Sequence, residues 1–228
     1  MFVCGVPKNI TEFLSVLNFE EDQFGEFSIP LKMARNIFAF RPEIYLAVTA
    51  LDGTVAAYSS VYPLKKKWAD AFIAGDIAEP DLTPDMLLSR QDALEGTCIY
   101  IGSIAVGRNY DPFSKSVLLA SLFFWRAQQL QDASVKRITA IMTPVTKHGE
   151  RLVRYVGAKR LGTNTDVNDH GIYSREVSPS FLYRITSSVE RFLSNSMVEM
   201  NLNFRPPLLP ASNVSNQSGA VSRSPERI

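Results

Sequence analysis

Hydrophobic residues recur at helical spacing in two segments near the N-terminus. In the first, a capping stretch, Asn9-Ile-Thr11, precedes the apolar positions of Glu12–Leu17 and predicts a helix start. In the second, Leu31–Phe40 carries an apolar face, and Pro42 closes it because the residue before a proline avoids the helical region. We therefore expect the first forty residues to be helical.

The pattern changes to strand periodicity after Pro42. Two apolar runs, Ile44–Ala50 and Val55–Tyr62, flank a turn with Asp52-Gly53 at its tip. An Asp-Gly turn between two such runs predicts an antiparallel hairpin. The polar stretch that follows, residues 63–96, is expected to be a mostly helical insert.

Strands and helices alternate in the second half of the chain. An apolar strand at 99–106 leads into a polar bend at 107–115 and a helix at 116–130. The helix is apolar on every side from Val117 to Trp125, which predicts that it is buried against a sheet. Further elements are expected in the order strand, helix, strand and helix, at 135–142, 147–156, 171–177 and 180–195.

This order of elements predicts an α/β (α+β) fold. The front half is antiparallel and a crossover unit lies behind it, which gives a mixed layout. We expect one domain over residues 1–200, with the insert 63–96 included. Proline, serine and asparagine accumulate over 201–228 and apolar periodicity stops there, so this segment is expected to be a disordered tail.

Composition narrows the classes of function. The 228 residues are 46% hydrophobic and 21% charged, with a net charge of +1, as in an ordinary soluble globule. That balance gives no electrostatic reason to expect nucleic acid or a membrane as partner. Neither a membrane-spanning run nor a signal peptide is evident, so a cytoplasmic location is expected. Cys4 and Cys98 are expected to be free thiols, and no metal-ligand spacing occurs.

The strand, bend and helix over 99–130 suggest the first candidate site. A tight loop whose N–H groups point outward, followed by a helix N-terminus, is a general site for anionic phosphate groups. The sequence therefore predicts an anion site near the start of the helix.

Four features together resemble the GNAT superfamily of acyl-CoA-dependent N-acyltransferases. They are the hairpin 44–62, the strand IYIGSIAV at 99–106, the long helix after its loop, and ITAIMTPVTKHGERLVRYVGAKRLG at 138–162. The last is similar to the family's strand, helix and Gly-aromatic turn, with Gly157 at the glycine. The resemblance implies a GNAT-like mixed, largely antiparallel central sheet flanked by helices.

The resemblance also implies a cofactor site for acetyl-CoA or another acyl-CoA as co-substrate. The pantetheine arm would lie along the backbone of Ile104, Ala105 and Val106, and the N–H of Val106 would polarise the thioester carbonyl. The diphosphate would lie on N–H groups at the helix start, from Phe113, Ser114, Lys115, Ser116 and Val117. Thr146, where the family commonly has an asparagine, is a further candidate for cofactor binding.

The loop departs from the family pattern Arg/Gln-x-x-Gly-x-Gly/Ala. Asp111, Ser114 and Ser116 occupy those slots here. Serine keeps the backbone donor and adds a hydroxyl, whereas the Asp111 carboxylate opposes a bound phosphate. Lys115 supplies positive charge nearby.

Three residues are candidates for acid–base catalysis. Val153 occupies the position of the family's catalytic tyrosine, and Tyr155 lies two positions further on. Tyr155 is a candidate acid, and the alternative role for its side chain is helix–sheet packing. His148 at a helix start is a candidate base or a surface cap. Glu95, just before the strand at 99–106, is a candidate base or a solvated loop charge.

The predicted function is transfer of an acyl group, acetyl in the first instance, from acyl-CoA to an amine of a small molecule or peptide. The insert 63–96 and the segment 162–173 would shape the acceptor pocket, and a homodimer is allowed for. The alternative is a catalytically impaired GNAT-fold protein that acts as an acyl-CoA-binding or protein-interaction module. Asp111, the two serines and the vacant tyrosine slot favour the alternative.

Overall fold

The computed structural model describes residues 1–25, 29–90, 92, 97–132, 137–164 and 170–205. Within them, eight strands form one sheet in the order β6-β7-β5-β4-β3-β2-β1-β8. The strands are β1 (Phe2–Gly5), β2 (Tyr45–Ala50), β3 (Val55–Leu64), β4 (Cys98–Val106), β5 (Ile138–Met142), β6 (Lys159–Asn164), β7 (His170–Val177) and β8 (Leu202–Phe204). The β1–β8 and β4–β5 pairs are parallel, and the other pairs are antiparallel.

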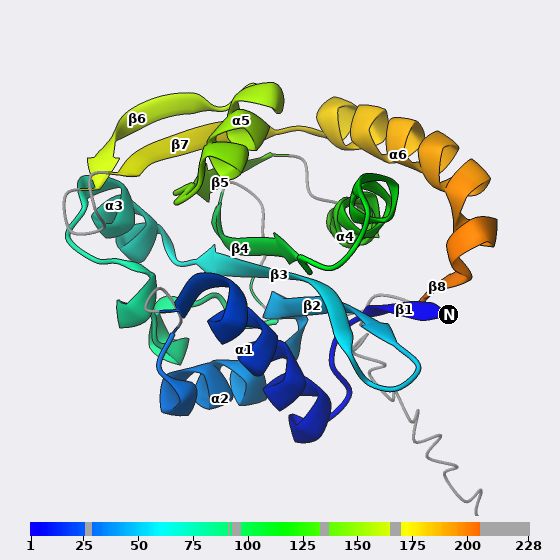
Figure 1. The fold of residues 1–228 in the computed structure, drawn as a ribbon. Coiled ribbons are helices and arrows are strands. Elements are labelled where there is room, and N and C mark those ends of the chain that lie inside the picture. The colour runs from blue at the N-terminus through cyan, green and yellow to red at the C-terminus, as the bar shows by residue number, and fades with distance from the viewer. Residues whose placement is uncertain (26–28, 91, 93–96, 133–136, 165–169, 206–228) are drawn as a thin grey trace, which may run out of the picture.

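Helices cover both faces of the sheet (Figure 1). They are α1 (Ile10–Phe24), α2 (Leu31–Phe40), α3 (Lys66–Ala74), α4 (Pro112–Asp132), α5 (Lys147–Tyr155) and α6 (Pro179–Met200), with short 3₁₀ turns η2 (Pro42–Ile44), η3 (Glu79–Asp81) and η4 (Pro84–Met86). Residues of α1, α2 and α3 pack into one apolar core, and those of α4, α5 and α6 into two others. The sheet therefore has an α1 face and an α4 face.

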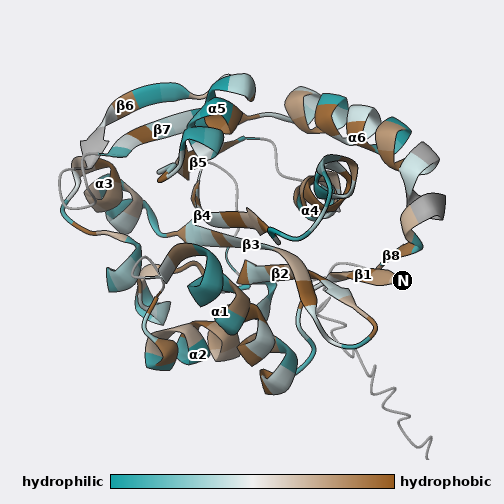
Figure 2. Cartoon of the chain, in the orientation of Figure 1, coloured by the Kyte–Doolittle hydropathy of each residue, from teal (hydrophilic) through white to brown (hydrophobic). Residues whose placement is uncertain are grey.

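The helices carry both hydrophobic and hydrophilic residues (Figure 2), and the buried ones pack against the sheet. On α4, Val117, Leu118, Leu122 and Trp125 are fully or almost fully buried, as the continuous apolar run predicts. Burying each such side chain contributes about 1.5–3 kcal/mol relative to leaving it exposed. The long helix is thus held against the sheet along much of its length.

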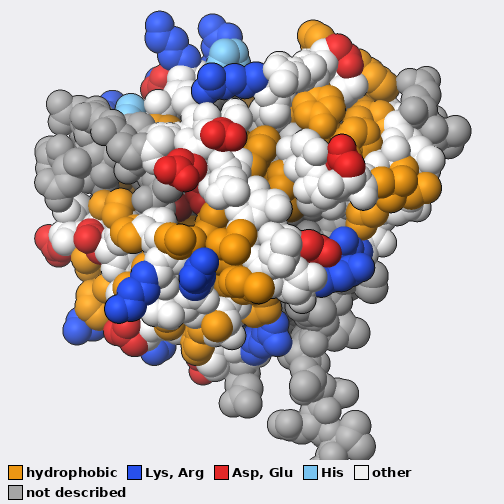
Figure 3. Space-filling view, turned by 60° about the horizontal axis from the view of Figure 1, so that its bottom comes forward, with side chains coloured by type: hydrophobic (Ala, Val, Ile, Leu, Met, Phe, Trp, Pro, Cys, Tyr) orange, Lys and Arg blue, Asp and Glu red, His pale blue; other side chains and the backbone are white. Residues whose placement is uncertain are grey.

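The outer side of α1 and α2 is mixed in character (Figure 3). Ile10, Leu31 and Phe40 of these helices are exposed, and charged side chains are interspersed with apolar ones across this view. Scattered apolar side chains of this kind are normal on a protein surface. None of the helices in the described part of the chain is long and apolar enough to cross a membrane.

Most predicted elements are confirmed, and two predictions are wrong. The helix over 31–40 and the hairpin are present, and Asn9 caps α1 by accepting a hydrogen bond from the Glu12 N–H at 2.9 Å. However, the N-terminal segment is not all helical, because β1 lies in it. The tail does not begin at 201, since β8 pairs with β1; residues 206–228 lie outside the described residues. The described part of the insert 63–96 contains α3 and two 3₁₀ turns, η3 and η4.

An irregularity in β4 opens the sheet. Ser59 of β3 pairs with Ile104 of β4, and Val61 pairs with Ile101. One residue of β3 therefore lies opposite two residues of β4, Gly102 and Ser103, which form a bulge. β5 pairs with β4 only from Cys98 to Ile101 and ends at Met142. Beyond the bulge, β4 continues to Val106 with β3 on one side and no β5 on the other. We call this opening the β4/β5 split.

Candidate active site

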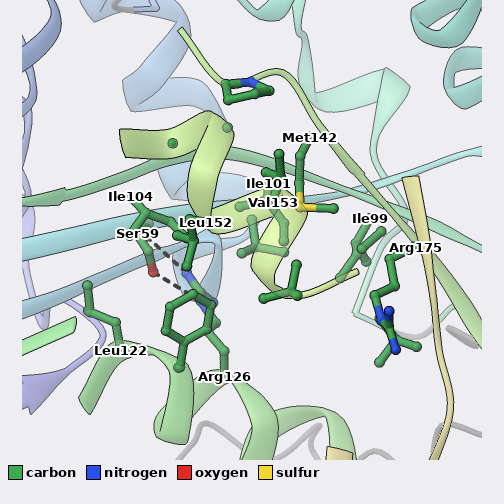
Figure 4. A pocket seen from close by; sticks show the side chains of 18 of the residues that line it. Ser59, Ile99, Ile101, Ile104, Leu122, Arg126, Met142, Leu152, Val153 and Arg175 are labelled. Carbon is green, nitrogen blue, oxygen red and sulfur yellow. Dashed lines mark hydrogen bonds between the residues drawn. The ribbon is translucent and has the colours of Figure 1, made fainter. Parts of the chain in front are cut away.

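A cavity of about 210 Å³ lies at the β4/β5 split. Its walls come from β4, β5, α4, α5 and the start of α6, and most of the lining side chains are apolar. Ile101, Met142 and Val153 gather around the same space, with Leu122 and Arg126 of α4 opposite (Figure 4). The lining also includes Gly102 of the bulge and Phe24 of α1, a helix of the α1 face. The cavity therefore reaches through the split from one face of the sheet toward the other.

The backbone of β4 offers a hydrogen-bond donor at the edge that β5 leaves open. The Gly107 N–H donates to the Ala56 carbonyl on β3 at 2.8 Å. Because successive N–H groups alternate in direction along a strand, the N–H of Val106 is directed to the other edge, which β5 leaves open. The strand thus aims a donor at the split, as the oxyanion role predicted for Val106 requires.

Two acidic side chains, one of them buried, lie behind the bulge, on the α1 face. Glu20 of α1 is 3% exposed, and its Oε1 accepts a hydrogen bond from the Ser103 hydroxyl at 2.9 Å. Glu79 of η3 accepts a hydrogen bond from the Tyr100 hydroxyl at 2.9 Å through Oε2. Its other oxygen, Oε1, lies against Gly102, so closely that a Cβ at Gly102 would collide with it. The bulge glycine is what lets this carboxyl group approach the strand.

Burial changes the proton affinity of both carboxyl groups. Loss of solvation raises the pKa of Glu20 to about 7, although the hydrogen bond from the Ser103 hydroxyl acts in the opposite direction. Loss of solvation, with the nearby charge of Glu20, raises the pKa of Glu79 to about 8. Both groups therefore exchange protons near neutral pH, where acid–base catalysis is most efficient.

Buried polar atoms without a hydrogen-bond partner concentrate around these carboxyl groups. The described residues contain six such side-chain atoms. Three are the hydroxyl oxygens of Tyr45, Tyr58 and Tyr62, a fourth is Glu79 Oε1, and a fifth is Thr143 Oγ1, just after β5. Buried groups of this kind are normally satisfied by water, an ion or a ligand. The α1 side of the split is therefore equipped to receive a polar group.

Arg126 fixes α4 to the sheet beside the cavity. Its guanidinium donates to the carbonyls of Glu43 and Ile44, both at 2.6 Å, and to the Ser59 carbonyl at 3.1 Å. Burial lowers its pKa to about 10, so the group stays charged at neutral pH. Figure 4 shows its bonds to Ser59 at the rim of the apolar space.

The predicted diphosphate loop has its donors already engaged. The Asp111 Oδ1 accepts hydrogen bonds from the N–H groups of Phe113 at 2.9 Å and Ser114 at 3.1 Å, and the Ser114 hydroxyl donates to Oδ2. The N–H of Lys115 donates to the Asp111 carbonyl, and its ammonium donates to the Arg108 carbonyl. Asp111 thus caps α4 with the negative charge that a diphosphate would otherwise bring.

The diphosphate site that the family resemblance implies predicts that replacing Asp111 by glycine tightens binding of acyl-CoA. The change frees two N–H donors and removes a like charge, and we expect Kd to fall about tenfold, the effect of roughly 1.4 kcal/mol. Isothermal titration of the variant and of the control Asp85→Gly, an exposed acidic residue of η4, measures this. An Asp111→Gly protein with unchanged or weaker affinity would show that the diphosphate does not bind at this loop.

The other predicted cofactor residues lie around the same region. Ile104 and Thr146 line the cavity, and Thr146 caps α5 by accepting a hydrogen bond from the Gly149 N–H at 3.0 Å. Ala105 and Val106 pair with β3 next to the split. The Ser116 hydroxyl donates to the Pro112 carbonyl, and Val117 is buried in the core.

Neither Tyr155 nor His148 lines the cavity. Tyr155 is 89% exposed at the end of α5, and His148 is exposed at the start of that helix. Glu95 lies outside the described residues. Val153, in the slot of the family's tyrosine, is 5% exposed and lines the cavity.

Sequence reasoning missed Glu20 and Glu79, which are far from β4 in the chain. One signal pointed toward them: an isolated glycine within a strand, Gly102, indicates a bulge or a close approach by another group. Nothing in the sequence shows which side chain makes that approach. Glu79 does lie within the insert that was predicted to shape the acceptor pocket.

Comparison with known proteins supports the fold. The sequence matches no family profile and no curated protein. Among solved structures it is similar to the NatC complex bound to Gag peptide and CoA, at 12% identity and a TM-score of 0.51 over 78% of this chain and 98% of that chain. It is also similar to mosquito arylalkylamine N-acetyltransferase like 5b, at 12% identity and a TM-score of 0.50 over 78% of this chain and 100% of that chain. The chain has the GNAT fold, with a mixed, mostly antiparallel sheet.

Proposed function

We propose that this protein is an N-acyltransferase that moves an acyl group from acyl-CoA to an amine of a small molecule or peptide. The observation that carries the proposal is the cavity through the β4/β5 split. It is apolar on the α4 face, and two carboxyl groups of raised pKa lie behind it on the α1 face. A thioester and an amine would meet at the opening.

The donor half of the site uses β4. The thioester carbonyl oxygen would accept a hydrogen bond from the Val106 N–H, which stabilises the charge that develops on this oxygen during attack. The acyl group would point into the apolar cavity.

The acceptor half uses the carboxyl groups. Glu79, as carboxylate, takes one proton from the bound ammonium group, and the nitrogen lone pair then attacks the thioester carbon. A C–N bond forms and the C–S bond breaks. The second nitrogen proton passes to the departing thiolate, so the products are an amide and free CoA thiol, with one proton left on Glu79. A carboxylate with a pKa near 8 is a stronger base than an ordinary one, which suits this step.

A binding protein without transfer activity is the second candidate. The Asp111 cap on the phosphate loop and the valine in the tyrosine slot favour it. Both candidates bind acyl-CoA, but only the first releases thiol when an amine is added.

Thermal unfolding with acyl-CoA tests what the two candidates share. At about 100 times Kd, a ligand of the native state adds about 2.7 kcal/mol to the free energy of unfolding. We expect a rise in Tm with at least one acyl-CoA. If no acyl-CoA of any chain length shifts Tm, neither candidate survives.

The raised pKa values also predict how stability depends on pH. Both glutamates have folded-state pKa values above the ordinary 4.5, so the folded protein binds more protons than the unfolded chain between pH 4.5 and about 8. Their contribution is fully present below pH 4.5 and is lost as pH rises through 7 to 8. Urea unfolding should therefore show that Glu20→Gln flattens this decline relative to wild type. Parallel pH curves for the two proteins would contradict the assignment.

A further inference from the structure

The cavity extends away from the end of α4 where CoA would enter. The predicted diphosphate donors lie at Phe113–Val117, in the first turns of α4. The α4 residues that line the cavity begin at Leu122 and continue to Leu130. At 1.5 Å per residue, the lined part of the helix is roughly 12 Å long. The cavity therefore continues past the split, beyond where a thioester carbon would lie.

The far part of the cavity is mostly apolar, with Gln129 of α4 and Arg175 of β7 as polar lining residues. Ile99 and Ala140 line it from the sheet, Leu130 from α4, and Leu182 and Ile185 from α6. Ile99, Ala140 and Leu182 are almost fully buried. An apolar cavity of about 150 Å³ in another protein stays dry and binds benzene. The cavity here, at about 210 Å³, is larger, and a methyl group would fill little of it.

We propose that the acyl group is an apolar chain of medium length, and that this protein selects it over acetyl. The inference rests on the proposed function, because it assigns the cavity to the donor's acyl chain. The thioester carbon lies at the split, the chain extends along α4 toward Leu130 and Ile185, and the reaction is unchanged: the acyl chain moves to nitrogen and the thiol is released. Each buried methylene contributes binding energy that acetyl cannot supply.

The first experiment measures chain-length preference with the full-length protein. Acetyl-, butyryl-, hexanoyl-, octanoyl- and dodecanoyl-CoA are compared for thermal shift and for kcat/KM of thiol release with an amine panel. Hexanoyl- or octanoyl-CoA should exceed acetyl-CoA at least tenfold, since each methylene in an apolar pocket changes selectivity severalfold or more. Acetyl-CoA equal to or better than the longer donors overturns the inference.

The second experiment fills the cavity from two independent walls. Ala127 on α4 and Ala140 on β5 both line it, and both are at most 5% exposed. Ala127→Leu and Ala140→Leu should each lower the ratio of octanoyl to butyryl activity at least tenfold. Ala74→Leu, an exposed change at the end of α3, is the matched control and should leave the ratio unchanged.

These outcomes separate the inference from the proposed function. If no acyl-CoA binds, the proposed function fails. If acyl-CoA binds and reacts but the optimum is acetyl, or if neither folded alanine variant moves the optimum, only the chain-length inference fails. Circular dichroism and Tm identify a variant that does not fold. In that case the chain-length series on wild type alone tests the chain-length inference.

Discussion

Replacing Glu79 by glutamine is expected to lower kcat about 10²–10⁴-fold, the range over which a positioned acid–base group contributes. Glutamine keeps the shape of the side chain and can still accept the Tyr100 hydrogen bond, but it takes no proton from an ammonium group. The Kd for acyl-CoA should change little, because Glu79 lies on the α1 face and the proposed acyl-chain cavity is apolar on the α4 face. Steady-state kinetics of thiol release measure the effect.

The pH profile distinguishes a base from a structural residue. In wild type, kcat/KM should rise with pH through an apparent pKa in the range of 7 to 8, and this limb should disappear in Glu79→Gln. Glu21→Gln, on the exposed side of α1, is the matched control and should keep the wild-type profile. A Glu79→Gln enzyme with wild-type kcat and an unchanged profile would remove Glu79 from the mechanism.

Replacing Arg126 by methionine is expected to lower the free energy of unfolding by about 3–5 kcal/mol. The change leaves the carbonyls of Glu43, Ile44 and Ser59 without their charged donor in a buried place, and such unpaired groups each cost roughly 1–3 kcal/mol. Urea unfolding at constant pH measures the loss. Arg35→Met, at an exposed position of α2, controls for the loss of a positive charge and should change stability by less than about 0.5 kcal/mol.

A small loss in Arg126→Met would show that the guanidinium does not hold α4 against the sheet. That outcome would also weaken the cavity assignment, because α4 forms one wall of the cavity. A large loss in the free energy of unfolding would support α4 as a firmly held wall of the cavity. Selection by chain length requires such a wall.

Local patterns predict much of the fold and little of the site. The hairpin, α2 and α4 follow from turn chemistry and apolar periodicity within short windows. β1 and β8 were missed because each is only three or four residues long and pairs with a distant segment, so its stability comes from partners that no window contains. Tertiary contact decides such elements.

The site depends still more on long-range contact. Glu20 meets Ser103 across 83 positions of sequence, and Glu79 meets Tyr100 from a 3₁₀ turn in the insert. The Asp111 cap was foreseeable as a charge in the wrong slot, but its bonds to Phe113 and Ser114 follow from how the loop turns into α4. The sequence therefore indicates where the donor could lie, and the fold brings in the acidic groups.

The central claim is that this chain transfers an acyl group at the β4/β5 split. The most direct measurement is mass spectrometric detection of acylated amine together with thiol release, with octanoyl-CoA and an amine panel, for wild type and Glu79→Gln. Wild type should form amide and thiol in equal amounts, and the variant at least about a hundredfold less of both. Saturable binding of acyl-CoA, with no amide from any amine in the panel, would contradict it.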